Sequence, residues 1–380
     1  MPEKNGKTRK VEVAAVKCGS YSPKDLDAAL EAAVSAAGGW PEKVKKAKKV
    51  LLKPNLLTAR PPEHAVTTHP EFLRAAIRAL RAIGVEKISV GDSPAGNHPW
   101  KKLWEATGVA EAAEAEGAEL LPFENIKRVD LPDGETLPIL KELDDFDALV
   151  SLPKLKTHIL TKITAAVKNS YGLIPGKAKS MFHGKHQSPA DMGRFLADSY
   201  APVKPDFVLM DAVVCMEGEG PANGRPFELG LVFAGADAVA VDSAACRVYG
   251  YKPSDIPLLA TAAERGHGVA DLEAIKLAGD GWDEAEKAAP KRSTSDFLHR
   301  IPPGLFHVLT LILACRPRIS TKECVKCGIC EKICSQNAIS KDKRGNYKVD
   351  WKKCVLCMCC VESCPKHAIE LRSLWTRWMD

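Results

Sequence analysis

The stretch from Cys324 to Glu370, CVKCGICEKICSQNAISKDKRGNYKVDWKKCVLCMCCVESCPKHAIE, holds nine of the thirteen cysteines in this 380-residue chain. Eight of them form two runs with one spacing, C-x2-C-x2-C-x3-C. The first run comprises Cys324, Cys327, Cys330 and Cys334, and the second comprises Cys354, Cys357, Cys360 and Cys364, followed by Pro365. Three cysteines at i, i+3 and i+6 on a tight loop can bind three corners of one metal cluster, whereas zinc sites pair C-x2-C units around a single ion. Two complete runs with a terminal Cys-Pro favour an iron–sulfur site over zinc.

The spacing resembles that of bacterial-type ferredoxins, which carry two [4Fe-4S] clusters. The resemblance implies that each cluster takes three cysteines from one run and the last cysteine from the other. It assigns Cys324, Cys327, Cys330 and Cys364 to cluster 1, and Cys354, Cys357, Cys360 and Cys334 to cluster 2. Ser335 stands where a proline usually follows the fourth cysteine. Cys359 is a ninth thiol, interpreted as a spare, with ligand exchange left open.

Residues 320–370 are therefore expected to form a small α+β ferredoxin-like two-cluster module. Short strands at 338–339 and 347–349 would flank the turn KDKRGN, and 368–370 would close the repeat. From Lys322 to Glu370 there are ten Lys or Arg and six Asp or Glu, a net charge of +4. This differs from the acidic surface common in free ferredoxins. It indicates either an acidic electron donor as partner or an offset of the cluster charge.

The long part before the module, residues 10–281, alternates short apolar runs with helical stretches. This pattern predicts an α/β domain, with a mixed or parallel sheet covered by helices on both faces. No G-x-G-x-x-G or Walker-type run is present, so a standard dinucleotide or P-loop site is not supported. Strands are expected at 11–16, 49–56, 87–93, 118–123, 148–155, 207–213, 231–242 and 274–279, and helices at 24–37, 70–83, 100–116, 190–200 and 238–248.

Residues 282–319 are expected to be a linker that ends in one packing helix, GLFHVLTLILAC at 304–315, and 371–380 a tail with Trp375 and Trp378. Interfacial membrane contact by these two segments is the less favoured interpretation. The sequence shows no secretion signal and no apolar run long enough to span a bilayer. Cysteine clusters of this kind indicate a reducing cytoplasm. A net charge of +6 is too weak to indicate nucleic acid.

Polar residues follow several expected strands. Lys53 and Asn55 come directly after an apolar run, and Asp92 ends another. Helix capping and turn formation are the alternative explanation for such residues. Further along, Asp211 ends a strand and Glu217 enters a glycine-rich turn, so both are candidates for an acidic wall of the same cleft.

The stretch 151–189 is purely cationic. It contains no Asp or Glu, but it contains Lys154, Lys156, Lys162, Lys168, Lys177, Lys179 and Lys185, together with His158, His183 and His186. Such a stretch needs an anionic counterpart, and an anion-binding cleft is favoured over a solvated basic loop or an RNA footprint, because few aromatic residues accompany it. In this interpretation Lys53, Lys154, Lys156 and Lys168 hold the anion, Asn55 and Asn169 orient it, and His158 or His183 donates protons.

Several motifs together resemble the domain of unknown function 362 family over roughly residues 10–280. These are LLKPNL, TTHPE, VGDSPAG, LPKLKTH with AVKNSYGLIPG, and MDAVVCMEGEGPANG with AGADAVAVD. Many members are similar in carrying a C-terminal two-cluster ferredoxin module. The resemblance implies a fold and an association with iron–sulfur clusters, but no reaction.

Fusion of a two-cluster module to a ligand-sized domain favours a reductase that passes electrons from the clusters to an anionic substrate or cofactor. The alternative is an electron-carrier or assembly subunit whose α/β domain binds a protein partner. A third hypothesis is a redox or oxygen sensor. The length of 282–319 predicts that the module folds back over the mouth of the cleft.

Overall fold

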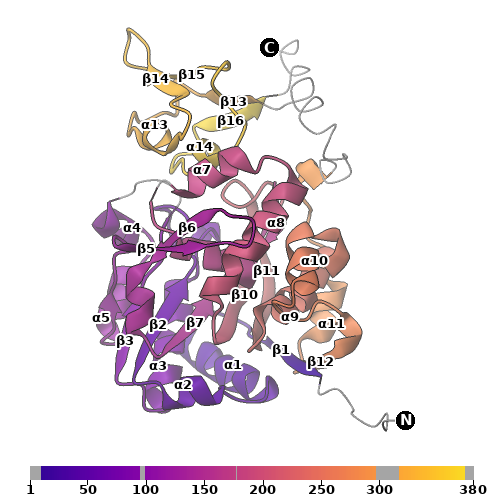
Figure 1. Ribbon diagram of the computed structural model, residues 1–380. Coiled ribbons are helices and arrows are strands. Elements are labelled where there is room, and N and C mark those ends of the chain that lie inside the picture. The colour runs from indigo at the N-terminus through magenta and orange to yellow at the C-terminus, as the bar shows by residue number, and fades with distance from the viewer. Residues whose placement is uncertain (1–9, 95–98, 177, 297–315, 373–380) are drawn as a thin grey trace.

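The computed structural model describes residues 10–94, 99–176, 178–296 and 316–372. A large α/β body carries a small C-terminal module at one end, drawn yellow in Figure 1. The expected packing helix at 304–315 and the tail with Trp375 and Trp378 lie outside the described residues. Within the described ranges, no helix is both long and apolar enough to cross a membrane.

The body is built on one mixed sheet of ten strands. Eight of them follow the order β12-β1-β11-β10-β7-β2-β3-β4, and β8 and β9 extend from β10. The strands from β10 to β4 in this order run parallel, whereas β11 is antiparallel to both β1 and β10. The strands are β1 (Val11–Lys17), β2 (Lys49–Pro54), β3 (Lys87–Val90), β4 (Glu119–Leu120), β7 (Ala148–Leu152), β8 (Lys154–His158), β9 (Lys162–Thr164), β10 (Phe207–Glu217), β11 (Arg225–Gly235) and β12 (Ile275–Ala278).

Helices cover both faces of the sheet, as the continuous apolar strands predict. In β2, Val50 and Leu52 face one core while Leu51 faces the other, because successive side chains point to opposite faces of a strand. The first core includes α1 (Pro23–Ala36), α2 (Glu42–Lys46), α3 (Pro70–Ala82), α4 (Trp100–Ala106) and α5 (Val109–Ala115). The second includes α6 (Ala166–Asn169), α8 (Pro189–Tyr200), α9 (Ala238–Ala245), α10 (Pro257–Glu264) and α11 (Trp282–Lys287). The expected fold class, α/β with a covered mixed sheet, is confirmed.

Several boundaries differ from the expectation. The strand expected at 231–242 is β11, which ends at Gly235, and the last residues of that range begin helix α9. The helix expected at 100–116 is two helices, because Gly108 adopts a left-handed φ of 72° between α4 and α5. Residues 282–296 belong to the body and not to a linker. The reason is apolar packing: the Trp282 ring lies 5.7 Å from that of Phe233, and Ala285 is buried.

The cationic stretch at 151–189 runs along the carboxyl edge of the sheet. It forms β8, β9, α6 and α7 (Ala178–Lys185), and every residue of β8 is buried. A hairpin of β5 (Ile126–Asp130) and β6 (Thr136–Leu140) lies beside it, as Figure 1 shows. The sequence did not predict β8 as a separate strand, since its KLKTH pattern has the charge of a surface segment.

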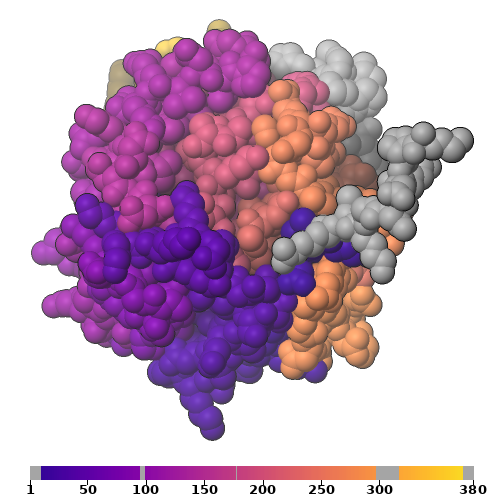
Figure 2. Space-filling model, turned by 60° about the horizontal axis from the view of Figure 1, so that its bottom comes forward, coloured from indigo at the N-terminus to yellow at the C-terminus, as the bar shows by residue number. Residues whose placement is uncertain are grey.

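The module repeats one small unit twice. Strand β13 (Arg316–Ile319) pairs with β16 (Ile369–Arg372), and β14 (Ile339–Lys341) pairs with β15 (Tyr347–Val349). Two short helices, α13 (Ile329–Ile333) and α14 (Cys359–Glu362), follow the cysteine loops. The expected α+β ferredoxin-like unit is confirmed. Its helix α14 faces the body near α7, and hairpin β14–β15 points away from the body (Figure 1). The opposite end of the body is covered by N-terminal residues, indigo in Figure 2, beside orange segments.

Candidate functional site

Lys53 and Asp92 form a buried ion pair at the carboxyl edge of the sheet. Lys53 Nζ lies 2.7 Å from Asp92 Oδ1 and donates to Asn169 Oδ1 at 3.0 Å. The other carboxylate oxygen of Asp92 accepts from the Leu56 N–H at 2.6 Å. Burial lowers the pKa of Lys53, and Asp92 opposes this effect. The pair stabilises the carboxyl edge of the sheet from within. Lys53 does not reach the pocket described next.

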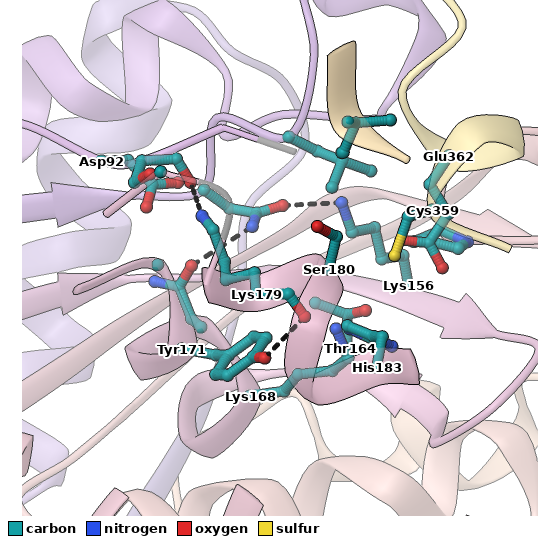
Figure 3. A pocket seen from close by; sticks show the side chains of 18 residues that line it. Asp92, Lys156, Thr164, Lys168, Tyr171, Lys179, Ser180, His183, Cys359 and Glu362 are labelled. Atoms are coloured by element: carbon teal, nitrogen blue, oxygen red, sulfur yellow. Dashed lines mark hydrogen bonds between the residues drawn. The ribbon is translucent and has the colours of Figure 1, made fainter. Parts of the chain in front are cut away.

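A pocket lies beside this pair, between the body and the module (Figure 3). Its cavity volume is about 70 Å³, which gives room for roughly five water molecules. A ligand held here is therefore small. The body lines it with side chains that include Asn55, Asp92, Lys156, Thr164, Lys168, Asn169, Lys179 and His183, and the module with Ile333, Cys359 and Glu362.

Lys156 and Lys168 are the two expected anion-binding lysines that reach the pocket. Lys156 Nζ donates to Asn55 Oδ1 and to the Val66 carbonyl, both at 2.6 Å. Burial is the main reason that the Lys156 pKa lies well below its usual value, and the nearby Lys168 lowers it further. The pKa of Lys168 is also lowered by burial, while Glu362 raises it. Two amines that repel each other in a confined space favour an anion between them.

Lys179 is a third pocket amine, which the sequence placed in the cationic stretch but not among the site residues. It lies in the first turn of α7 and donates to the Ser93 carbonyl. Burial lowers the pKa of Lys179 to about 7, with Lys53 and Lys168 lowering it and Asp92 raising it. This amine exchanges its proton near neutral pH, so it is the better candidate for proton donation.

Both candidate histidines are buried, with different partners. His158 Nδ1 accepts from the backbone N–H groups of Leu160 and Thr161, at 3.0 and 3.3 Å. Its proton is therefore on Nε2, which lies 3.6 Å from Glu362 Oε1. His183 lines the pocket, and burial lowers its pKa to about 3. Its imidazole is neutral at neutral pH, contrary to the expectation of a group that titrates there.

Two pocket side chains carry polar atoms without a hydrogen-bond partner among the described residues. These atoms are His183 Nδ1 and Thr164 Oγ1. Their side chains are 5% and 3% exposed, so water outside the pocket does not satisfy them. Because buried polar groups are nearly always hydrogen-bonded, both atoms point to a polar ligand in this pocket.

Glu362 and Cys359 are pocket residues that the module contributes. Glu362 is 6% exposed, and burial raises its pKa while Lys168 and Lys156 lower it. The sequence pattern gave no signal for it: Glu362 occupies the repeat position of Lys332, which is exposed, so the repeat predicts a solvated residue. Cys359 occupies the position of the buried Ile329 and is buried itself. Its expected role as a spare thiol stays a prediction.

Besides Lys53, three of the expected ligand residues lie outside the pocket. Lys154 Nζ is 2.9 Å from Asp211 Oδ2 and donates to the Tyr21 hydroxyl at 2.8 Å. Asp211 is fully buried and also accepts from the His69 backbone N–H. Glu217 accepts from the Lys291 N–H at 2.8 Å. Asp211 and Glu217 therefore do not form an acidic wall of this pocket, because backbone and lysine donors of the body already hold them.

The module repeats its backbone geometry at an offset of 30 residues, from Cys324 to Cys354. Residues at three matching places in each half have a positive φ: Lys326 and Leu356 at 56° and 55°, Gly328 and Met358 at 78° and 59°, and Asn337 and His367 at 48° and 50°. Non-glycine residues adopt such angles only where their surroundings require it. The sulfurs match as well, because Cys334 Sγ accepts from Ala338 N–H at 3.2 Å and Cys364 Sγ from Ala368 N–H at 3.3 Å.

The thiols assigned to cluster 1 gather in the set that the resemblance to ferredoxins implies. A cavity is lined by Cys324, Cys327, Cys330 and Cys364. Burial raises the pKa of Cys330 to about 12, and the three other members of this set raise it too. Cys354 is likewise influenced by Cys357 and Cys334. Burial raises the pKa of Cys360 well above its usual value. Its neighbours Cys354, Cys357 and Cys334, and Cys330 of the other set, raise this pKa further, so Cys360 lies where the two sets meet. Four thiols around a hollow, with N–H donors to sulfur, fit a cubane cluster.

The module is docked on the body by buried polar contacts. Arg60 is 1% exposed, and its guanidinium donates to the carbonyls of Ala222 and Cys364, the latter at 2.6 Å. Ser335 donates to the Ser180 carbonyl at 3.1 Å. The structure thus places the module over the mouth of the pocket.

Comparison with known proteins is consistent with this division. Residues 323–369 match the model of a 4Fe-4S dicluster domain, so the module is an iron–sulfur electron-transfer domain. A thylakoid-associated protein of Synechocystis is 32% identical over 249 residues, which cover 65% of this chain and 77% of that protein.

Two solved structures have weaker likeness. They are a lactate racemase apoprotein from Thermoanaerobacterium thermosaccharolyticum (14% identity, TM-score 0.39) and a Thermotoga maritima protein (16%, 0.37). The matches cover 62% and 59% of this chain, and 56% and 57% of those chains. Residues 50–247 match the domain of unknown function DUF362. The chain therefore belongs to the DUF362 family.

Proposed function

We propose that this protein is an iron–sulfur reductase. Two [4Fe-4S] clusters, one on Cys324, Cys327, Cys330 and Cys364 and the other on Cys334, Cys354, Cys357 and Cys360, pass electrons to a small anionic substrate or cofactor in the pocket. The observation that carries the proposal is the composition of the pocket wall. Three lysines come from the body, while Ile333 and Cys359, each next to a cysteine of cluster 2, come from the module.

This arrangement suits one-electron delivery at short range. Bound clusters supply single electrons at a potential tuned by hydrogen bonds and exposure. Because Ile333 precedes Cys334 and Cys359 precedes Cys360, cluster 2 is the one beside the pocket. A free electron carrier has no need for a polar pocket at this junction.

The residues of the body bind the ligand and supply its protons. Lys156 and Lys168 hold the anion, and Asn55 fixes the position of the Lys156 amine. Asn169 holds Asn55 in turn through a 3.2 Å hydrogen bond. Lys179 gives a proton to the reduced ligand, because its pKa of about 7 matches neutral conditions. The neutral His183 offers a further hydrogen bond.

We propose that the electrons come from a soluble, acidic one-electron donor in the cytoplasm. Cysteine clusters that bind metal are usual in a reducing compartment, where disulfides are rare. A reduction by two electrons and two protons would need two encounters with such a donor, or both clusters reduced beforehand.

The test begins with protein purified without oxygen and with iron and zinc quantitation. The clusters are then reduced, excess reductant is removed, and small carboxylates and phosphates are added one at a time while the cluster absorbance is followed. A substrate should reoxidise the clusters in the native protein and at least about tenfold more slowly in Lys168→Met. Lys204→Met is the matched control, since Lys204 is exposed and outside the pocket.

Zinc in place of iron would end the redox proposal. Reoxidation by a protein acceptor alone, with no small anion effective, would favour the electron-carrier or assembly role instead.

A further inference from the structure

The end of the module far from the pocket exposes cluster 1. Of the cysteines that the structure describes, Cys327 is exposed, and all the others are buried or half-buried. Val325, between Cys324 and Cys327, is 58% exposed, which is unusual for a large apolar side chain. The four thiols of cluster 1 thus lie behind an exposed apolar spot. Electrons can cross there without passing through the body.

Basic side chains surround this spot. Lys366 lines the cavity of the cluster 1 cysteines. The amine of Lys326 reaches the turn of hairpin β14–β15, where it would lie 4.0 Å from a Cβ atom added to Gly345. Lys341, Lys343 and Arg344 are exposed on the same hairpin. We call Lys326, Lys341, Lys343, Arg344 and Lys366 the basic rim.

Within the described part of the module no ion pair joins the basic rim to a carboxylate, and its five basic residues outnumber the nearby acids Asp342, Glu331 and Glu323. Asp342 accepts from the backbone N–H groups of Arg344 and Asn346, at 2.8 and 2.9 Å. Glu331 accepts from the Tyr347 hydroxyl at 3.2 Å. Glu323 is the exposed acidic residue of the first cysteine run. The face keeps a positive field around an apolar centre.

The two clusters are therefore placed in order. Cluster 1 opens to solvent through Cys327, whereas Ile333 and Cys359 of the cluster 2 side face the pocket. We propose that Val325, Cys327 and the basic rim form the docking face for an acidic one-electron carrier protein, and that electrons enter through cluster 1. The inference rests on the proposed function in one respect, that the module carries two redox-active clusters. It does not depend on the proposed substrate in the pocket.

An acidic protein fits this face better than an anionic membrane. Opposite charges steer a carrier to the face and raise its association rate, and an apolar contact at the centre brings the redox centres close. A lipid surface would satisfy the lysines equally, but it has no electron to give to an exposed cluster ligand.

The experiment measures the rate of cluster reduction with no substrate present, so failure of the pocket proposal would leave it intact. A photoreduced acidic flavodoxin is mixed with the oxidised protein by stopped flow. Lys343→Glu with Arg344→Glu should lower the second-order rate constant at least about tenfold at low salt, and the difference should shrink as salt rises. Lys45→Glu with Lys46→Glu is the matched control, because both lysines lie on α2 at the other end of the body.

A small neutral reductant, photoreduced deazariboflavin, should reduce native and variant clusters at equal rates. If it is slowed too, the two residues act on the clusters themselves and the docking proposal is wrong. Equal rates with flavodoxin would also overturn it. A third outcome would also overturn the proposal. If the variant no longer binds phosphatidylcholine–phosphatidylglycerol vesicles but is reduced by flavodoxin at the native rate, the face is a membrane-binding surface.

Discussion

Lys154 and Lys156 lie two residues apart on β8, and both are buried, yet their surroundings differ completely. Lys154 meets the carboxylate of Asp211 at 2.9 Å. Lys156 meets only neutral oxygens, those of Asn55 and Val66. Within the described residues, Lys156 makes no ion pair. The body thus neutralises Lys154 with a carboxylate, whereas Lys156 has no carboxylate partner of its own, which is what the proposed anion binding requires.

This difference separates supporting lysines from binding lysines. Lys53 belongs with Lys154, because its amine is paired with Asp92. Lys156 and Lys168 belong together in the pocket, where Glu362 of the module is the nearby acid. A buried cation without its own carboxylate is costly in the empty protein, and an anionic ligand recovers that cost. Four predictions test this division.

The largest effect should follow from breaking the supporting pair. Asp211→Asn keeps the shape of the side chain but leaves the Lys154 charge buried without its partner. The free energy of unfolding should fall by about 3–5 kcal/mol, measured by urea denaturation followed by circular dichroism. The double variant Lys154→Met with Asp211→Asn should regain much of that loss, because the buried charge is gone and the amide oxygen still accepts a hydrogen bond from its neighbours. If the single variant is as stable as the native protein, Lys154 is not held by charge.

A slightly smaller loss of folding stability should follow from a substitution that crowds the buried Lys53–Asp92 pair. A Cβ on Gly172 would lie 1.9 Å from Asp92 Oδ1 and 2.6 Å from Lys53 Nζ. Gly172→Ala must therefore displace the pair, at a cost of roughly 3 kcal/mol. Gly19→Ala is a useful control, because its φ lies outside the left-handed region and a Cβ there would meet only Asp25 Oδ2, at 4.0 Å. A Gly172→Ala protein with native stability would mean that the pair can shift without cost.

The sequence predicts the local parts of this molecule well. The cysteine spacing indicates the module because all its information lies within 47 residues. Most expected strands recur with small shifts, but the strand expected at 231–242 runs into helix α9. Charge alone predicted Lys156 and Lys168 as anion-binding residues, and both line the pocket; their binding of an anion stays a prediction. The sequence could not separate Lys154 from Lys156, since Asp211 lies 57 residues from Lys154. Only the folded sheet brings β8 beside β10 and shows which lysine is paired.

Glu362 shows the same limit. A glutamate between two cysteine ligands has the ordinary pattern of a solvated helix residue. It becomes a pocket residue only because the module docks on the body through Arg60 and Ser335. That docking depends on long-range contacts, which periodicity and spacing do not report.

Removing a binding lysine should affect stability little and binding strongly. Lys156→Met replaces a buried cation that has no carboxylate partner, so the free energy of unfolding should change by no more than about 1 kcal/mol. Affinity for the anion, measured by calorimetry, should fall at least about tenfold. A loss of several kcal/mol in stability would place Lys156 with the supporting lysines instead.

The smallest expected effect is a dependence of anion affinity on pH, which distinguishes Lys179 from the other lysines of the pocket. Lys179 has a pKa of about 7 in the protein and faces Asp92, Lys53, Lys168 and Cys359. Its ammonium form is present below pH 7 and is lost above it, so anion affinity should fall about tenfold from pH 6 to pH 8. Stability should move the other way between pH 7 and the ordinary lysine pKa, because the unfolded chain then binds the extra proton. Lys179→Arg should bind the anion with no such slope, since a guanidinium stays charged. An unchanged slope in that variant would assign the titration to another group, and the proton donor of the proposed reduction would have to be sought elsewhere.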